Sequence, residues 1–337
     1  MKAVAYYQPL AIDHPEALLD IELPAPQAGP RDLLVEVRAI SVNPVDTKIR
    51  SRVQPPAGEA KVLGWDVAGV VREVGEAVTL FRPGDRVWYA GALDRPGANS
   101  ELHVVDERLV GRMPDSLAFA QAAALPLTAI TAWELLFDRL AVPAGKRPDA
   151  RTLLVVGAAG GVGSILVQLA RRLTGLTVIG TASRPETQAW VLAQGAHHVI
   201  DHRQPLAEEL ARIGLPQVDL VASLNATDHH FAALAEVIAP QGKLALIDDP
   251  AQLDVGLLKR KSVSLHWEFM YTRSMFQTPD MIAQHRLLTD VAALVDDGVL
   301  RTTVAEHFGR IDAANLRRAH ALLESGKSRG KIVLEGF

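Results

Sequence analysis

The chain has 337 residues, which is too many for one ordinary hydrophobic core, so its length predicts two domains. The charged share of 22% and the net charge of −4 are typical of a globular protein and do not favour nucleic acid as a partner. There is no cysteine, which excludes disulfides, thiolate metal sites and a catalytic thiol.

The sequence does not favour a membrane protein. The N-terminal segment 1–7 lacks the long apolar region and the cleavage site of a signal peptide. The longest uncharged stretch, from Leu117 to Trp133, is interrupted by Pro126 and is short for a membrane span. We expect buried core helices there, and a cytoplasmic protein with neither membrane nor nucleic-acid partners.

The first third of the chain is typical of a β-rich domain. Leu33–Ile40 and Val67–Val74 are predicted strands, and the turn Pro83–Asp85 precedes a third strand at Arg86–Tyr89. Short strands separated by turn residues favour a partly closed β-barrel.

The pattern changes near residue 115. Ser116 is a plausible N-cap for a short alanine-rich helix, which Pro126 is expected to end before a second helix over Ile130–Leu140.

From Thr152 onward, apolar strands alternate with helices. The predicted strands are Leu153–Val156, Thr177–Thr181, His198–Ile200, Val218–Val221, Lys243–Ile247 and Val263–Trp267. The predicted helices are Ser164–Leu173, Thr187–Gln194 and Phe231–Ile238. This alternation predicts a doubly wound parallel sheet in an α/β domain, covered by helices on both faces.

After about residue 270 this alternation stops. Helices are expected over Pro279–Gly298 and Ala313–Ser325, and a last strand over Lys331–Leu334. We therefore predict a dinucleotide-binding domain over residues 126–268, inserted into a second domain made of residues 1–125 and 269–337.

A glycine-rich turn follows the first strand of the inserted domain. The segment Gly157–Ser164 leaves that strand and opens a helix, which is where a diphosphate-binding turn is needed. Backbone N–H groups of Ala159, Gly160, Gly161 and Val162 are expected to hold the diphosphate, aided by the helix dipole. The alternative is a purely structural glycine loop.

The end of the second strand indicates which dinucleotide binds. Sites that prefer NAD place a carboxylate there for the ribose 2′-OH, and this strand instead leads to Ser183 and Arg184. A hydroxyl and a guanidinium suit a 2′-phosphate, which predicts NADPH. The alternative is that Arg184 is an ordinary surface charge before Pro185.

These features together resemble the medium-chain dehydrogenase/reductase superfamily. The resemblance rests on the glycine turn and on Ile40–Asp46, Gly64–Gly69 and Leu125–Thr128, and it continues to Ser325–Leu334. Within the superfamily the chain is most similar to quinone oxidoreductases and zinc-type alcohol dehydrogenase-like proteins. The resemblance implies a Rossmann domain inserted into a GroES-like domain, and a homodimer formed through the edge strand at about Val263–Phe269.

The resemblance also allows the zinc ligands to be checked. The ligand positions of zinc-bearing relatives match Asn43, Trp65 and Leu127 here, none of which is a credible zinc ligand. The histidines His197, His198, His202, His229 and His230 are expected at strand and helix ends instead. We therefore predict no metal.

Further roles are implied by the resemblance, position by position. Thr128, Asn43 and Thr47 match residues beside the nicotinamide, and His202 matches a contact to the adenosine or its phosphate. Leu224, Leu246 and Ile247 match strand ends near the nicotinamide, although plain core packing is the alternative. Residues Trp267, Glu268, Phe269 and Met270 match a segment that closes the cleft. Lys331 matches a basic residue that meets the pyrophosphate.

The sequence therefore predicts a zinc-independent reductase that transfers hydride from NADPH to a small quinone or α,β-unsaturated carbonyl. Without a metal, hydrogen-bond donors must stabilise the developing oxyanion. The candidate donors are Asn43, Thr47, Tyr89 and Trp65, whereas Asp46 is expected to order the Asn43 loop. The alternatives are a zinc-type alcohol dehydrogenase with unusual ligands and a non-catalytic NADPH-binding protein.

Overall fold

Six apolar strands of the insertion form one parallel sheet. In spatial order they are β11 (His198–Ile200), β10 (Thr177–Thr181), β9 (Thr152–Val156), β12 (Val218–Ser223), β13 (Ile238–Leu246) and β14 (Ser264–Trp267). Because the chain winds outward from β9 on one side and from β12 on the other, the strand order reverses between these two neighbours. Ligands of open α/β sheets bind at such a reversal, beyond the carboxyl ends of the strands.

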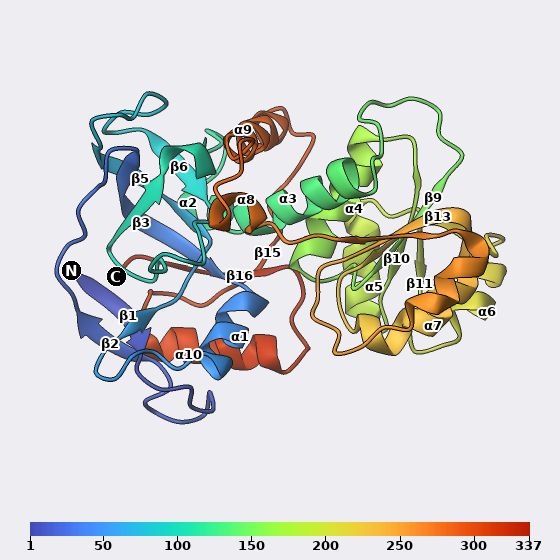
Figure 1. Cartoon of the computed structure of the whole chain (residues 1–337), viewed down its shortest axis with the longest axis horizontal. Helices are drawn as coiled ribbons and strands as arrows, with labels where there is room; N and C mark the ends of the chain where they lie inside the picture. The colour runs from blue at the N-terminus through green and yellow to red at the C-terminus, as the bar shows by residue number, and fades with distance from the viewer. The chain divides into compact units, whose positions relative to one another are not determined.

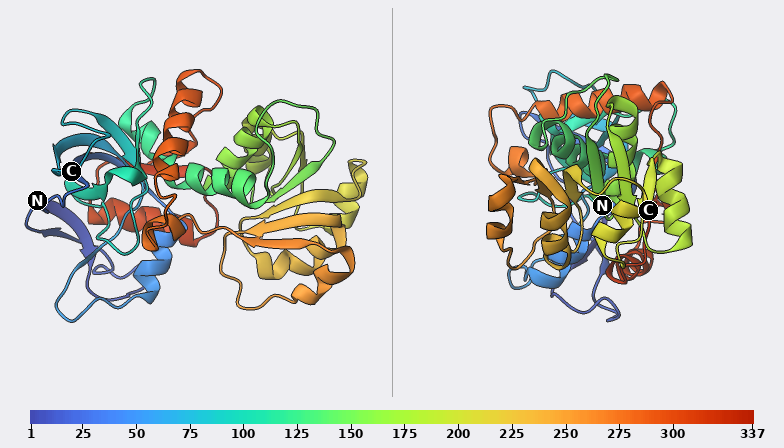
Figure 2. Two further views of the ribbon diagram at one scale, coloured as in Figure 1. Left: turned by 45° about the horizontal axis from the view of Figure 1, so that its top comes forward. Right: turned by 90° about the vertical axis from the view of Figure 1, so that its right-hand side faces the viewer.

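Helices flank this sheet on both sides (Figure 2, right). Helices α4 (Gly161–Leu173) and α5 (Pro185–Gln194) pack together and against β9, β10 and β11. Helices α6 (Leu206–Arg212) and α7 (Thr227–Val237), with the short 3-10 helix η3 (Val255–Lys261), form another group. Apolar side chains such as Phe231, Leu234 and Val221 are buried in the core beside α7. The predicted doubly wound sheet is confirmed.

The computed structural model describes residues 1–337, which divide into two units. Unit 1 contains Met1–Ile130 and Tyr271–Phe337, and unit 2 contains Thr131–Met270 (Figure 1). These divisions lie next to the predicted domain boundaries at 125/126 and 268/269.

Unit 1 is built around the long strand β3 (Asp32–Val42). The strands of its larger sheet, in spatial order, are β15 (Val304–His307), β16 (Lys331–Glu335), β3, β5 (Val67–Val74), β6 (Arg86–Tyr89) and β8 (Val110–Arg112), with β7 (Leu102–Asp106) paired to β3. Register irregularities near Val35 and Val37 accompany the pairing of β3 with β5. A smaller sheet contains β2 (Leu19–Glu22), β1 (Lys2–Tyr6) and β4 (Lys61–Val62). The predicted GroES-like antiparallel domain is confirmed.

Six helical segments lie entirely within unit 1. They are α1 (Pro44–Arg52), η1 (Glu107–Leu109), α2 (Phe119–Ala123), α8 (Thr272–Met275), α9 (Ala283–Asp296) and α10 (Ala313–Glu324). Helix α1 is absent from the sequence prediction because its two buried side chains, Asp46 and Arg50, are charged. Without a buried apolar stripe, it has no helical hydrophobic period to detect.

The helices around Pro126 differ from the prediction. Pro126 begins helix α3 (Pro126–Trp133), which continues into a π-helical turn, η2 (Glu134–Arg139). Proline is accepted in a first helical turn because the N–H that it lacks would have no partner there. The stretch Phe119–Arg139 has the length and apolar composition of a membrane span, but 83% of its most apolar window is buried inside the protein.

Candidate functional site: a diphosphate turn and a buried polar cluster

The glycine turn of unit 2 leaves a helix start open. After β9, Gly157 has a φ of +78°, which favours glycine, and Gly160 is the N-cap residue of α4. The N–H of Gly160 is bonded to Gly157 O at 3.1 Å, whereas the N–H groups of Gly161 and Val162 have no acceptor. Both residues are partly exposed, as are Ala159 and Gly160. This turn therefore offers free N–H groups at a helix start, the arrangement that binds a diphosphate.

Close backbone packing fixes the shape of this turn. A Cβ on Gly163 would lie 2.5 Å from Gly157 O and 2.6 Å from Ala158 Cα. The N–H of Gly157 also donates to Thr181 Oγ1 at 3.1 Å, which ties the turn to the end of β10. The turn and the end of the second strand are therefore held next to each other.

Two guanidinium groups lie at the end of β10. Arg184, at the N-cap of α5, pairs with Glu186 at 2.9 Å and is 34% exposed. Arg203 pairs with Asp201 at 2.6 Å and donates to Ser183 O at 2.7 Å, with 62% of its side chain exposed. Hydrogen bonding to Arg203 lowers the pKa of Asp201. Both cations are accessible enough to meet a phosphate near Ser183.

Sequence reasoning missed Arg203. It follows β11 by three residues, and β11 pairs with β10 in parallel. Because the carboxyl ends of neighbouring parallel strands lie at the same sheet edge, a basic residue just after β11 falls beside the end of β10. That signal was available in the sequence.

The other predicted cofactor residues of unit 2 also follow strands of this sheet. Leu224 and Ile247 come directly after β12 and β13, and both are partly exposed. His202 follows β11 and is partly buried against His230, with ring centroids 5.9 Å apart. Burial lowers the pKa of His202, which favours the neutral imidazole. Contacts of these three residues with a cofactor stay predictions.

Two aromatic side chains at the end of β14 and just after it are exposed. Trp267 and Phe269 are 54% and 46% exposed. Between them, Glu268 is buried, and its carboxylate accepts from Arg139 Nε at 2.8 Å. The predicted contact of these aromatic rings with a cofactor stays untested.

In unit 1, the predicted catalytic segment surrounds a buried polar cluster. Asn43, Asp46, Asp66 and Lys331 are each no more than 3% exposed. Asn43 Nδ2 donates to Asp66 Oδ2 at 2.9 Å, and the Asn43 N–H donates to Asp46 Oδ2 at 2.7 Å. Asp46 therefore orders the Asn43 loop, as expected from the sequence. Asn43 itself is fully engaged with protein groups.

The ammonium group of Lys331 is bonded entirely within the protein. It donates to Val42 O at 3.0 Å, to Asp66 Oδ2 at 2.9 Å and to Asn43 Oδ1. A lysine has three N–H donors, and all three are used here. The predicted contact with a pyrophosphate stays a prediction, and it would require one of these three bonds to break.

Two of the predicted oxyanion donors, Trp65 and Tyr89, are also hydrogen-bonded to other groups of the protein. The indole of Trp65 donates to Ala92 O at 3.1 Å, and the residue is 1% exposed. The phenol of Tyr89 lies 3.0 Å from His103 Nδ1, and burial raises its pKa well above the ordinary value. Burial also lowers the pKa of His103 to about 4, which keeps its imidazole neutral. Neither Trp65 nor Tyr89 offers a donor to a substrate.

The two predicted threonines differ in access. Thr128 is buried, and its hydroxyl donates to Leu125 O at 3.1 Å. Thr47 is partly exposed, and its hydroxyl donates to Pro44 O at 2.9 Å within α1. Thr47 is thus the one member of the predicted donor set with an accessible hydroxyl.

The residues present do not fit a zinc ion. The Asn43 amide is held by Lys331 and Asp66, the Trp65 indole points to a carbonyl, and Leu127 is apolar. No group of three or more histidine, aspartate or glutamate side chains is arranged to hold a metal. The zinc positions inferred from the resemblance therefore lack ligand chemistry.

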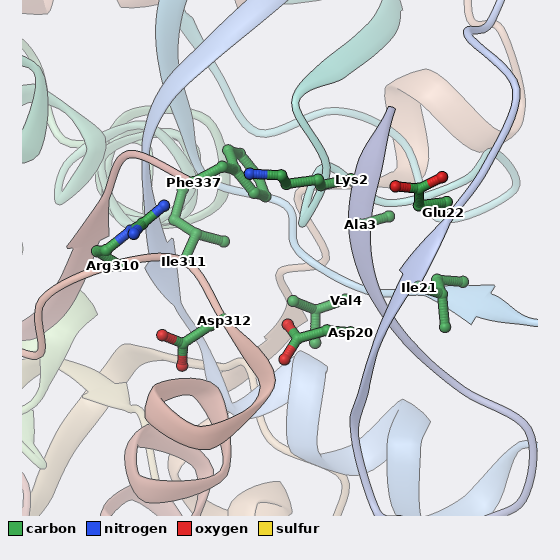
Figure 3. A pocket seen from close by; sticks show the side chains of 10 residues that line it. All are labelled: Lys2, Ala3, Val4, Asp20, Ile21, Glu22, Arg310, Ile311, Asp312 and Phe337. Atoms are coloured by element: carbon green, nitrogen blue, oxygen red, sulfur yellow. The ribbon is translucent and has the colours of Figure 1, made fainter.

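A pocket of about 450 Å³ lies elsewhere in unit 1 (Figure 3). It lies beside β1 and β2, and charged side chains of both signs line it, among them Lys2, Glu22 and Arg310. None of the predicted site residues lines this pocket, so it belongs to neither part of the candidate site.

Two family models match the chain. One, described as an alcohol dehydrogenase GroES-like domain, matches residues 29–122. The other, described as a zinc-binding dehydrogenase, matches residues 194–334. Together they cover parts of both units.

The chain is also similar to whole proteins. A zinc-type alcohol dehydrogenase-like protein of Staphylococcus epidermidis is 36% identical over 99% of each chain. A crystallised Rhizobium etli CFN 42 protein named for zinc-dependent alcohol dehydrogenases is 58% identical, with a TM-score of 0.96 over 100% of this chain and 98% of that one. The Escherichia coli quinone oxidoreductase, crystallised with NADPH, is 27% identical with a TM-score of 0.84 over 100% of both chains.

The glycine turn predicts different effects for two alanine substitutions. Gly163→Ala places a methyl group against backbone atoms that cannot move aside, so it should lower Tm and abolish binding of a nicotinamide dinucleotide. At Gly160 the nearest atom to an added Cβ, Gly157 O, is 3.4 Å away. Gly160→Ala should therefore keep the wild-type Tm and weaken binding at the open N–H groups. Thermal unfolding and fluorescence titration measure both, and unaltered binding by Gly163→Ala would contradict this role of the turn.

The buried carboxyl of Asp46 predicts an unusual pH dependence. Burial raises its pKa from 3.8 to about 7, and the charge of Lys331 opposes this only in part. A carboxyl with a higher pKa in the folded state binds its proton more tightly there, so its contribution to stability falls as pH rises from about 4 to about 7. Asp46→Asn keeps an acceptor for the Asn43 N–H and removes this titration.

The expected result is that the Tm of Asp46→Asn relative to wild type increases across that pH range, by roughly a few degrees. Tm measured in a series of buffers checks this, with the exposed Asp297→Asn as a control that should follow wild type. Parallel curves for wild type and Asp46→Asn would refute the raised pKa.

Proposed function

Because the chain belongs to the medium-chain dehydrogenase/reductase superfamily, we propose that it uses NADPH to reduce quinones or small α,β-unsaturated carbonyl compounds. The observation that supports this most directly is the open start of helix α4, with Arg184 and Arg203 at the end of the neighbouring strand. The quinone oxidoreductase of Escherichia coli, with this fold, was crystallised with NADPH. A cytoplasmic location is part of the same proposal.

The residues of unit 2 fit a dinucleotide in a defined way. The N–H groups of Gly161 and Val162 would hold the diphosphate, where the positive end of the helix dipole adds to their attraction. Ser183, Arg184 and Arg203 would hold the 2′-phosphate, since guanidinium groups form strong charge-assisted hydrogen bonds with phosphate oxygens. The partly exposed Leu224 and Ile247 would contact the apolar side of the nicotinamide.

The proposed reaction needs a hydride and a proton. The reduced nicotinamide, when bound, supplies the hydride, and solvent water supplies the proton to the reduced acceptor. In this chain, Thr47 is the accessible hydroxyl among the predicted donors, so we assign it the hydrogen bond to the acceptor oxygen. Its single O–H donates to Pro44 O in the structure and would rotate from that carbonyl to the acceptor oxygen. Alcohol oxidation is a weaker candidate, because it requires an alkoxide and the residues at the zinc positions cannot ligate the metal that stabilises one.

The first experiment combines binding and turnover. NADPH and NADH are titrated by fluorescence, and reduction of phenanthrenequinone is followed by nicotinamide absorbance. We expect binding of NADPH and quinone-dependent oxidation of it. Binding without turnover on any acceptor would favour a non-catalytic NADPH-binding protein, and stoichiometric zinc with alcohol oxidation would favour a zinc-type dehydrogenase with unusual ligands.

The 2′-phosphate assignment gives a sharper prediction for two arginines. Arg184→Ala and Arg203→Ala should each weaken NADPH binding by about tenfold, the effect of losing one charge-assisted hydrogen bond. NADH binding should change little, because NADH has no 2′-phosphate. Arg172→Ala, in the last turn of α4, is the matched control and should affect neither cofactor. Equal losses for NADPH and NADH would contradict the assignment.

We also propose that the chain forms a homodimer through strand β14. This strand pairs with β13 on one side and is the last strand of the sheet on the other, so its outer backbone groups are available to a second copy. The exposed rings of Trp267 and Phe269 would add apolar area to such a contact.

The dimer predicts a difference between two lysine substitutions. Trp267 and Val255 are both 54% exposed, but Trp267 belongs to β14 and Val255 to η3. Trp267→Lys should shift the dimer toward monomer in light scattering after size exclusion, because the interface would have to bury its charge. Val255→Lys should leave the mass unchanged. A monomeric wild-type protein would refute the proposal.

A further inference from the structure

The ammonium group of Lys331 is the one buried cation of the polar cluster, and the proposed function gives it no task. Lys331 begins β16, and only 3% of its side chain is exposed. Its three oxygen acceptors come from β3, from the residue that follows β3 and from the segment before β5. This lysine therefore joins the start of β16 to two segments that are far from it in sequence, residues 42–43 and residue 66.

Stability alone does not explain the pair with Asp66. Transferring two charges out of water is costly, and well-packed apolar residues of similar volume often stabilise a protein as well or better. Asp66 also accepts from Leu127 N at 2.8 Å and from Asn43 Nδ2 at 2.9 Å. The charged groups of Lys331 and Asp66 instead orient their partners, because each hydrogen bond fixes the position of a particular group.

The group that is fixed most completely is Asn43. Its side-chain oxygen faces Lys331, its side-chain nitrogen faces Asp66, and its backbone N–H is bonded to Asp46. Asn43 immediately precedes α1, whose first turns carry Thr47. Any change at the ammonium group is therefore passed to the start of the helix that presents the accessible hydroxyl.

We propose that Lys331 is a positioning residue, whose ammonium group acts as a resident cation in an oxygen-lined pocket and fixes the Asn43–Thr47 segment for hydride acceptance. The catalytic part of this inference rests on the proposed function. The resident cation does not, because it follows from the three oxygens around Nζ. Removal of the side chain leaves a buried pocket lined by the same three oxygen acceptors, one of them from the Asp66 carboxylate. These acceptors suit one primary ammonium ion.

The test is chemical rescue of Lys331→Ala. Propylammonium replaces the three methylenes and the ammonium group that this substitution removes, whereas tetramethylammonium has the charge and no N–H. We expect the variant to have a lower Tm, a kcat for quinone reduction lower by about tenfold or more and an unchanged KM for NADPH. Propylammonium should restore Tm and kcat, and tetramethylammonium at equal ionic strength should restore neither.

The controls separate this role from others. Wild type and Lys327→Ala, four residues earlier in the same segment, should not respond to propylammonium. A raised KM for NADPH with kcat unchanged would overturn the proposal in favour of a phosphate contact. Recovery of Tm without recovery of kcat would reduce Lys331 to a structural cation and overturn the positioning role.

If Lys331→Ala folds poorly, a second pair of variants tests the same positioning role. Lys331→Met alone leaves Asp66 without its cation, whereas Lys331→Met combined with Asp66→Asn removes both charges. The double variant should recover Tm relative to the single one and keep a low kcat. A double variant with wild-type kcat would refute the positioning role. If wild type reduces no acceptor, the proposed function fails, and rescue of Tm still tests the resident cation.

Discussion

Helix α4 begins beside the end of strand β9 because no side chain separates the two backbones at Gly163. A single methyl group there would meet Gly157 O at 2.5 Å, far inside van der Waals contact. The close approach fixes the first turn of α4, in which the N–H groups of Gly161 and Val162 have no acceptor. The bond from Gly157 N to Thr181 Oγ1 then places the end of β10 beside the same turn. Ser183, Arg184 and Arg203 lie at that end of the strand. The open N–H groups that suit unit 2 to a diphosphate therefore depend on that close approach at Gly163.

Unit 1 is organised by charge rather than by a metal ligand set. Its buried cluster contains two carboxylates and one ammonium group, held by short hydrogen bonds. Burial raises the pKa of Asp46 to about 7 and also raises that of Asp66, although Lys331 opposes both effects. Such a cluster is sensitive to loss of any one partner, because the others are then left buried without compensation. It gives the Asn43 segment a defined position that apolar packing alone would not specify.

Local patterns predicted unit 2 more completely than unit 1. Strands β10 and β11 of unit 2 have the predicted bounds, as do β5 and β6 of unit 1. All six strands of the unit 2 sheet were predicted, whereas β1, β2, β4, β7, β8 and β15 of unit 1 were not. Helix α1 and the ion pair of Lys331 were missed for a common reason: their buried groups are charged, and the partners lie far away along the chain. Lys331 and Asp66 are 265 residues apart, and no periodicity connects them. The hydrogen-bond partners of Trp65 and Tyr89 were missed for the same reason, because Ala92 and His103 approach them only in the folded chain.

Because Trp65 and Tyr89 already donate to protein groups, fewer donors are left to stabilise an oxyanion on a substrate. A phenol with its pKa raised by burial and bonded to a neutral imidazole does not deliver a proton to a substrate at neutral pH. An indole on a backbone carbonyl does not stabilise an oxyanion elsewhere. Few protein donors then remain, so the acceptors best suited to this chain are those whose negative charge spreads over a conjugated system after hydride addition. Quinones and enones have that property, whereas an isolated carbonyl concentrates the charge on one oxygen and demands more hydrogen bonds or a metal ion. The internal bonds of unit 1 thus favour the same substrate class as the residues at the positions that match the zinc ligands of relatives.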